Sequence, residues 1–172
     1  MRFASKLGSS VPVAVGTLLS MIAFAIPLGG CPGDDDVCTD YSPPASFDAQ
    51  NPKVTFAKDV MPIFSQSCAF ASCHGSASGS ANGVFLGGTD PIRVHQAIFD
   101  VRSSKLPTMP FVKAGDPRES FLMRKMDGSH CLLDAQCTDN DCGQSMPKND
   151  ETLSVDARDV VRRWIAQGAK ND

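Results

Sequence analysis

The sequence predicts a small all-α domain of short helices joined by long loops. Four segments each combine a helix-starting signal with apolar residues at helical spacing, and no strand-length segment alternates apolar and polar residues. The 14 glycines and 12 prolines among 172 residues, with few aromatic residues, also favour short helices and long connections. This domain is expected at residues 53–172, after two N-terminal segments of different character.

Residues 1–30 have the layout of a secretory signal peptide. Arg2 and Lys6 precede an apolar stretch over residues 11–28. A single transmembrane anchor is the alternative interpretation. It is disfavoured because such an anchor needs about 20 strongly apolar residues, and two prolines and a glycine interrupt this stretch.

The apolar stretch ends in Leu28-Gly29-Gly30-Cys31, which resembles the bacterial lipobox. In that motif a lipid is attached to the cysteine thiol and the peptide is cut just before it, so Cys31 is the expected lipidation site. A lipid there would hold an exported, periplasmic or cell-surface protein at a membrane without spanning it. Residues 31–52 are rich in proline, glycine and aspartate without apolar periodicity, which predicts a flexible tether.

The first two predicted helices begin with an acidic cap and an early proline. Asp59 is the expected cap of a helix that has Pro62 in its first turn and ends near Cys68. Asp90 followed by Pro91 predicts the start of the second helix, which carries His95. The inward residues expected on this second helix are Val94, Ala97, Ile98 and Val101.

The last two helices carry the clearest boundaries. Asp116 is expected to cap the third helix, Glu119 to return a hydrogen bond to that cap, and Gly128 to end the helix. The fourth helix is expected to run from Ser154 to Gly168. Its expected buried residues are Ala157, Val160, Val161, Trp164 and Ile165.

The chemistry-bearing residues concentrate in the segment from Cys68 to Gly75. Two thiols and a histidine directly after the second one, Cys68, Cys73 and His74, are the groups that hold a c-type haem: the sulfurs become thioethers and the imidazole ligates the iron. The alternatives are a local disulfide and a zinc half-site, with His74 adjacent by coincidence. Zinc needs about four N or S ligands, and exported proteins seldom keep reactive thiols for it.

Five segments, in their order along the chain, resemble exported cytochrome c-like domains of the myxobacterial and planctomycete lipoprotein type. The segments are 56–64, 68–75, 115–122, Met146-Pro147 and 164–169, so the resemblance covers residues 53–172. The chain departs from the common pattern because four residues, not two, separate Cys68 and Cys73; this longer spacing is known in some multihaem cytochromes. The resemblance implies that His74 is the proximal iron ligand and Met146 the distal one.

Other residues remain open as the second ligand. Met109 is also followed by proline, and His95 and His130 could supply a second imidazole. Each has a simpler interpretation as a packed or hydrogen-bonded side chain, and Met146 itself could be a packed or exposed methionine.

The seven cysteines include an even number that could form disulfides. With Cys31 assigned to lipid and Cys68 and Cys73 to haem, four remain, and three pairings into disulfides are possible. These candidates are Cys38, Cys131, Cys137 and Cys142. A second haem is not expected, because Gly143 follows Cys142 where a histidine would be needed. Acidic residues in the loop over 129–145 could suggest calcium, but their spacing does not match the twelve-residue calcium loop, so a solvated loop is expected.

The function expected from these features is electron transfer by one covalent haem c in a membrane-tethered lipoprotein, with a redox partner that the sequence does not identify. One alternative is a haem-free, disulfide-stapled surface lipoprotein that acts in binding. Another is the relay subunit of a larger exported oxidoreductase. No enzyme activity of its own is expected, because no nucleophile with a matched base is visible. Nucleic-acid binding is not expected, because the net charge is −3 and no basic block occurs.

Overall fold

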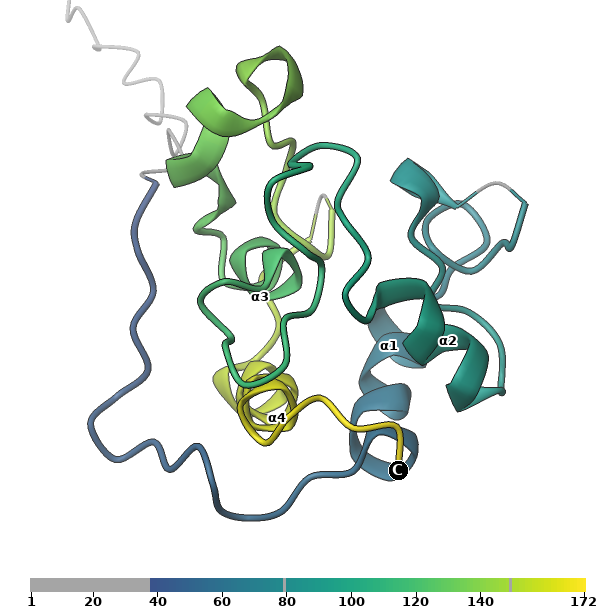
Figure 1. The fold of residues 1–172 in the computed structure, drawn as a ribbon, viewed down its shortest axis with the longest axis vertical. Helices are drawn as coiled ribbons and strands as arrows, with labels where there is room; N and C mark the ends of the chain where they lie inside the picture. The colour runs from purple at the N-terminus through teal and green to yellow at the C-terminus, as the bar shows by residue number, and fades with distance from the viewer. Residues whose placement is uncertain (1–37, 79, 149) are drawn as a thin grey trace, which may run out of the picture. The chain divides into compact units, whose positions relative to one another are not determined.

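The computed structural model describes residues 38–78, 80–148 and 150–172, which lie in one unit that begins at Asp36. The predicted signal peptide at 1–30 and the predicted lipidation site Cys31 lie outside the described residues. Within the described ranges the regular structure is helical, and extended backbone forms only isolated bridges (Figure 1). The all-α prediction is therefore confirmed at the level of class. None of the helices described is long and apolar enough to cross a membrane.

Eight helical elements follow one another along the described chain. They are the π-helical turn η1 (Phe56–Val60), α1 (Met61–Ser67), the 3-10 turn η2 (Ala81–Gly83), α2 (Pro91–Ile98), α3 (Phe121–Met126), the 3-10 elements η3 (His130–Gln136) and η4 (Thr138–Asn140), and α4 (Val155–Ala166). Two of them, η3 and η4, lie in the segment 129–145 that was expected to be an irregular loop.

The first helix begins earlier than expected. Thr55 precedes η1, and Asp59 accepts hydrogen bonds from the Thr55 backbone N–H at 2.7 Å and its hydroxyl at 2.9 Å. Asp59 therefore lies inside η1 and accepts hydrogen bonds from the residue that precedes it. It does not cap the helix α1 that follows. Pro62 lies in the first turn of α1, and α1 ends at Cys68, as predicted.

Helix α2 has the predicted cap but ends sooner than expected. The Asp90 carboxylate accepts from the backbone N–H of Ile92 at 3.0 Å, while Val94 and Ile98 are buried. Phe99 has extended backbone and begins the loop that leads to α3. Because Val101 lies beyond the end of the helix, it is 39% exposed, and the prediction that it faces inward was wrong.

Helix α3 begins after the predicted cap. Asp116 accepts from the Glu119 N–H at 3.2 Å, which closes a turn and not the first turn of a helix. The predicted capping box does not form, because the Asp116 N–H donates to the carbonyl of Lys113. Gly128 follows the helix with a φ of +71°, a left-handed value that favours glycine, so the predicted stop is confirmed.

Helix α4 matches its predicted boundaries. The Ser154 hydroxyl accepts from the Ala157 N–H at 3.3 Å, and Gly168, with a φ of +106°, follows the last turn. The predicted residues Val161, Trp164 and Ile165 are fully buried. Val160 and Ala157 are only partly buried.

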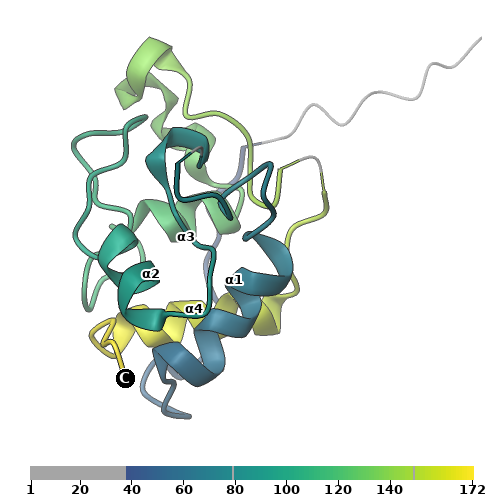
Figure 2. The same ribbon diagram turned by 90° about the vertical axis from the view of Figure 1, so that its right-hand side faces the viewer.

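The core lies where η1 meets α2 and α4, and α3 contacts α4 from another direction (Figure 2). The rings of Phe56 and Trp164 approach to 4.9 Å between centroids. The end of the chain closes this region, because the Asp172 carboxylate accepts from the Phe56 N–H at 3.1 Å. This packing holds α1, which leads into the Cys68 segment, in place.

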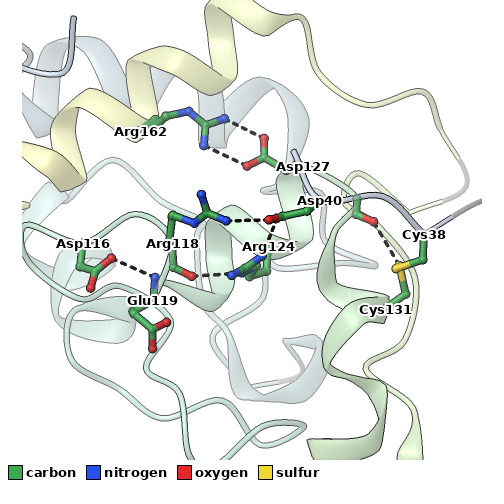
Figure 3. A network of polar contacts seen from close by, with 10 residues as sticks. Cys38, Asp40, Asp116, Arg118, Glu119, Arg124, Asp127, Cys131 and Arg162 are labelled. Atoms are coloured by element: carbon green, nitrogen blue, oxygen red, sulfur yellow. Dashed lines mark hydrogen bonds and ion pairs between the residues drawn. A yellow bond between two sulfur atoms is a disulfide. The ribbon is translucent and has the colours of Figure 1, made fainter. Parts of the chain in front are cut away.

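Residues 38–52, which we call the N-terminal strap, contact the helical domain although this segment was predicted to belong to a flexible tether. Cys38 is disulfide-bonded to Cys131. Asp40 forms ion pairs with Arg118 at 2.6 Å and Arg124 at 2.9 Å (Figure 3). The ring of Tyr41 lies below the guanidinium groups of two arginines of α4, at 4.5 and 4.8 Å.

A buried ion-pair network joins α3 to α4 below the strap. Asp127, at the end of α3, pairs with Arg162 at 2.8 Å (Figure 3). Asp127 also pairs with Arg158 at 2.8 Å, and Asp159 pairs with Arg162 at 3.1 Å. All four side chains are less than a tenth exposed. Burial alone would lower the pKa of Arg162, but the hydrogen bonds and charge of Asp127 keep that pKa raised above its ordinary value.

Candidate functional site

One cavity of about 810 Å³ brings together the four residues predicted to bind haem. Cys68, Cys73, His74 and Met146 all line it. Its volume falls within the range of about 300 to 1,000 Å³ that is typical of sites for small molecules and cofactors. The apolar part of the remaining wall includes Val84, Leu86, Ile98, Phe111, Phe121, Leu122 and Met126, and polar and charged residues such as Lys105, Lys125, Asp141 and Glu151 also line the cavity.

The segment that follows α1 folds into a tight loop that places both cysteines at this cavity. The N–H groups of Cys73 and Gly75 both donate to the carbonyl of Phe70, at 2.8 and 2.9 Å. Gly75 is required here because a Cβ at this position would overlap the backbone carbonyl of Ala69. Gly87 is required in the same way, because its Cβ would overlap the backbone of Gly75.

The two cysteines of the segment are unpaired thiols. Among the described cysteines, only Cys68 and Cys73 are not in disulfides, and both are partly buried. Burial, with a smaller effect of the neighbouring Cys73, raises the pKa of Cys68 to about 11. Cys68 is therefore a protonated thiol at neutral pH in the protein as described.

His74 is oriented by a backbone acceptor. Its Nδ1 lies 3.1 Å from the carbonyl oxygen of Val84. A carbonyl only accepts, so Nδ1 carries the proton and Nε2 keeps a free lone pair. The His74 carbonyl also accepts from the Leu86 N–H at 2.8 Å, and burial lowers the pKa of the imidazole. The neutral ring is the form that ligates metals.

Two methionines line the cavity. Met146 is half-buried and lies in the loop before α4, and its N–H donates to the carbonyl of Lys125 at 2.9 Å. Met126, on α3, is 2% exposed and lines the same cavity. Nothing in the local sequence pattern around Met126 separates a cavity-lining methionine from a packed one.

The three other residues considered as ligands do not line the cavity. Met109 is packed in the core and is 8% exposed. The Nε2 of His95 lies 2.7 Å from the carbonyl of Ala169, and its ring stacks on Phe99 at 4.8 Å. His130 is buried in η3, and its Nδ1 has no hydrogen-bond partner.

The four remaining cysteines form two disulfides, which selects one of the three pairings left open by the sequence. Cys38 pairs with Cys131 across 93 residues, and Cys137 pairs with Cys142 across five. Cys142 also lines the cavity, so the shorter disulfide holds one end of the segment that leads to Met146.

Lys125 is a cavity residue that the sequence analysis did not single out. It is 8% exposed, and its ammonium donates to the carbonyl of Cys142 at 2.7 Å. Burial lowers the pKa of Lys125 to about 8, and the charges of Asp141 and Asp134 limit that decrease. A lysine among the apolar residues of a short helix face was the only signal available in the sequence.

No group of three or more histidine, cysteine, aspartate or glutamate side chains is arranged to hold a metal ion within the ranges that the structure covers. Comparison of the chain with protein-family models, with curated proteins and with solved structures gave no match.

Proposed function

We propose that this chain is an electron-transfer protein that carries one covalent c-type haem, bound through Cys68 and Cys73 and ligated by His74 and Met146. The observation that carries the proposal is the cavity of about 810 Å³ at which two unpaired thiols, an oriented imidazole and a thioether meet. The sulfur and nitrogen donors match those of haem c, and the apolar wall suits a porphyrin.

The two cysteines supply the covalent attachment. In haem c, each thiol adds across a vinyl group, so that a carbon–sulfur bond forms and the thiol hydrogen goes to the other vinyl carbon. This step needs two free thiols at one cavity, and Cys68 and Cys73 meet that condition. The tight loop closed on Phe70, and the glycine at Gly75, hold the two sulfurs and His74 in one short segment.

His74 and Met146 are the proposed axial ligands. The hydrogen bond from Nδ1 to Val84 fixes the ring orientation and leaves Nε2 as the donor atom. A methionine sulfur in the second position favours ferrous iron relative to a second imidazole, so it raises the reduction potential. The bound haem supplies one-electron redox chemistry, and the protein residues set its ligands, its orientation and its access to water.

The cellular setting remains part of the proposal. Export by the segment at 1–30, and a lipid on Cys31, would place the haem domain at a membrane surface in an oxidising compartment. The two disulfides among the described residues suit such a compartment.

The test is covalent haem content. The full chain is produced in a bacterial host that matures c-type cytochromes, and denaturing gels are stained for haem peroxidase activity. We expect a stained band for the wild type and a loss of staining for Cys68→Ala/Cys73→Ala. Cys137→Ala/Cys142→Ala is the matched control, because it removes two cysteines with the same spacing, and it should keep the stain.

A colourless wild type would contradict the proposal. If Cys68 and Cys73 were then found linked to each other by peptide mapping, the haem-free, disulfide-stapled lipoprotein would become the better explanation. A haem-bearing chain that copurifies with an exported enzyme would instead make it the relay subunit of that enzyme.

A further inference from the structure

Lys125 contacts the Met146 segment at both of its ends. Its backbone carbonyl accepts from the Met146 N–H at 2.9 Å, and its ammonium donates to the carbonyl of Cys142 at 2.7 Å. These two bonds come from one residue of α3 and are four positions apart on the segment. Lys125 therefore holds both ends of the segment 142–146, one through its side chain and the other through its backbone carbonyl.

The surroundings strengthen this arrangement. Gly143 has a φ of +76°, and a Cβ there would come to 3.5 Å from the Lys125 Nζ, so the loop passes close to the ammonium. Asp134 accepts from the Cys142 N–H at 2.8 Å, and Cys142 is bonded to Cys137. The start of the segment is thus fixed by three contacts, whereas the Met146 end is held by its backbone bond to Lys125.

A buried ammonium is costly unless it is hydrogen-bonded, because its charge must leave water. Lys125 is 8% exposed, and its side chain lies at the cavity that Met146 lines. The bond to Cys142 offsets part of that cost, so the ammonium and the loop hold each other in place. Without the ammonium, the Cys142 carbonyl would lose its partner and the loop would gain freedom.

We propose that Lys125 is a positioning residue that holds the Met146 thioether at the cavity. This inference rests on the proposed function, because it assigns Lys125 a role in setting the distal ligand. Lys125 does not touch the iron in this proposal. It acts through the backbone of residues 142–146.

The test uses Lys125→Leu in the full-length haem-loaded protein. This change keeps an apolar side chain and the backbone carbonyl, removes the ammonium, and adds no thioether at the cavity. Methionine bound to ferric low-spin haem gives a weak absorption band near the red end of the visible spectrum. We expect unchanged haem content, loss of at least half of this band, and at least a tenfold faster reaction of the ferric protein with added imidazole.

Lys105→Leu is the matched control, since Lys105 also lines the cavity but its side chain makes no hydrogen bond among the described residues. It should leave the band and the imidazole reaction unchanged. Lys125→Arg, which keeps a charged donor, should retain most of the band and shows whether a cation is sufficient if Lys125→Leu does not fold. Amide hydrogen exchange gives a readout that does not depend on haem: the Met146 N–H should exchange at least tenfold faster in Lys125→Leu than in the wild type.

The outcomes separate the two proposals. A wild type without haem, or with haem but without the methionine band, overturns the proposed function or its distal ligand, and this inference with it. A wild type with the band, combined with a Lys125→Leu protein that keeps the band and the Met146 exchange rate, overturns only the role of Lys125.

Discussion

At the residue scale, two thioethers share the cavity, and only one of them could be the sixth ligand of the proposed haem. Met126 sits on α3 and is 2% exposed, so its side chain is held by core packing. Met146 sits in a loop that is restrained by a disulfide and by Lys125. A loop can adjust its distance to a bound group more readily than a packed helix, which favours Met146 as the ligand.

Leucine substitutions test this choice, because leucine is close to methionine in volume and such exchanges usually cost less than about 1.5 kcal/mol. Met146→Leu should abolish the red absorption band and lower the midpoint potential, with the haem still attached. Met126→Leu should leave both properties unchanged. The opposite pattern, with the band lost only in Met126→Leu, would assign the ligand to α3.

The sequence could single out Cys68, Cys73, His74 and Met146 as candidates because each carries a local pattern or an order along the chain, and the structure places all four at one cavity. Val84 and Gly87 could not be found in this way. Val84 acts through a backbone carbonyl, which any residue provides, and Gly87 matters only because the backbone of Gly75 packs against it. Both contacts join residues that are about ten positions or more apart in the chain, so no local sequence pattern predicts them.

At the element scale, the entry to η1 depends on one carboxylate. Hydrogen bonds from the Thr55 backbone and hydroxyl hold the pKa of Asp59 below its ordinary value of 3.8, against the opposing effect of burial. A lowered carboxyl pKa means that the ionised form stabilises the folded state. That contribution is fully present above about pH 3.8 and is lost as the pH falls through the lowered value.

Asp59→Asn should therefore reduce the free energy of unfolding by about 1 kcal/mol at pH 7, a magnitude typical of a lost helix cap. The difference from the wild type should shrink as the pH falls below 3.8. Urea unfolding at pH 7 and at pH 3 measures both effects. Asp139→Asn is the control and should have little effect at either pH, because Asp139 is exposed and its side chain makes no hydrogen bond to the residues described. An equal loss at both pH values for Asp59→Asn would show that its charge is not involved.

Helix boundaries were predictable where the cap and the apolar face coincide. At α4, Ser154 is followed directly by the helical repeat of apolar residues, and the boundary was correct. At α3, Asp116 and Glu119 carry a strong start signal, but the Asp116 carboxylate accepts from the Glu119 backbone N–H to close a turn, and the helix begins only after Ser120. An aspartate followed three residues later by a glutamate is compatible with a turn as well as with a helix start, so the local pattern could not distinguish these two structures.

At the scale of the whole molecule, the two disulfides close loops of very different length. In the chain-entropy model, a bridge across 93 residues contributes roughly 4 to 5 kcal/mol, and one across five residues contributes roughly 2 kcal/mol. The longer bridge joins the N-terminal strap to η3, so it also holds the strap over the ion-pair network.

Cys38→Ala/Cys131→Ala should therefore lower the free energy of unfolding about twice as much as Cys137→Ala/Cys142→Ala. Urea unfolding of the two double variants, followed by circular dichroism without reductant, makes the comparison. Equal losses would mean that residual structure in the unfolded chain, and not loop length, governs their contributions.

The strap was the largest feature that composition did not indicate. Its prolines and aspartates suggested a tether, yet Asp40 and Tyr41 meet arginines that come from α3, α4 and the loop before α3. The burial of Arg158 and Arg162 has the same origin, because the strap and Asp127 cover a helix face that would otherwise be exposed. Such pairing between charges far apart in the chain produces no periodic sequence pattern, so it could not be predicted.

The disulfide between Cys38 and Cys131 also limits how far the domain could lie from a lipid on Cys31. With a lipid there, as proposed, the chain from Cys31 to Cys38 can span at most about 25 Å. A tether that stayed free through residue 52 would allow about 75 Å. An oxidised protein would thus keep the domain close to the bilayer, and reduction of this bond would lengthen the free chain only if Asp40 and Tyr41 also left their arginines.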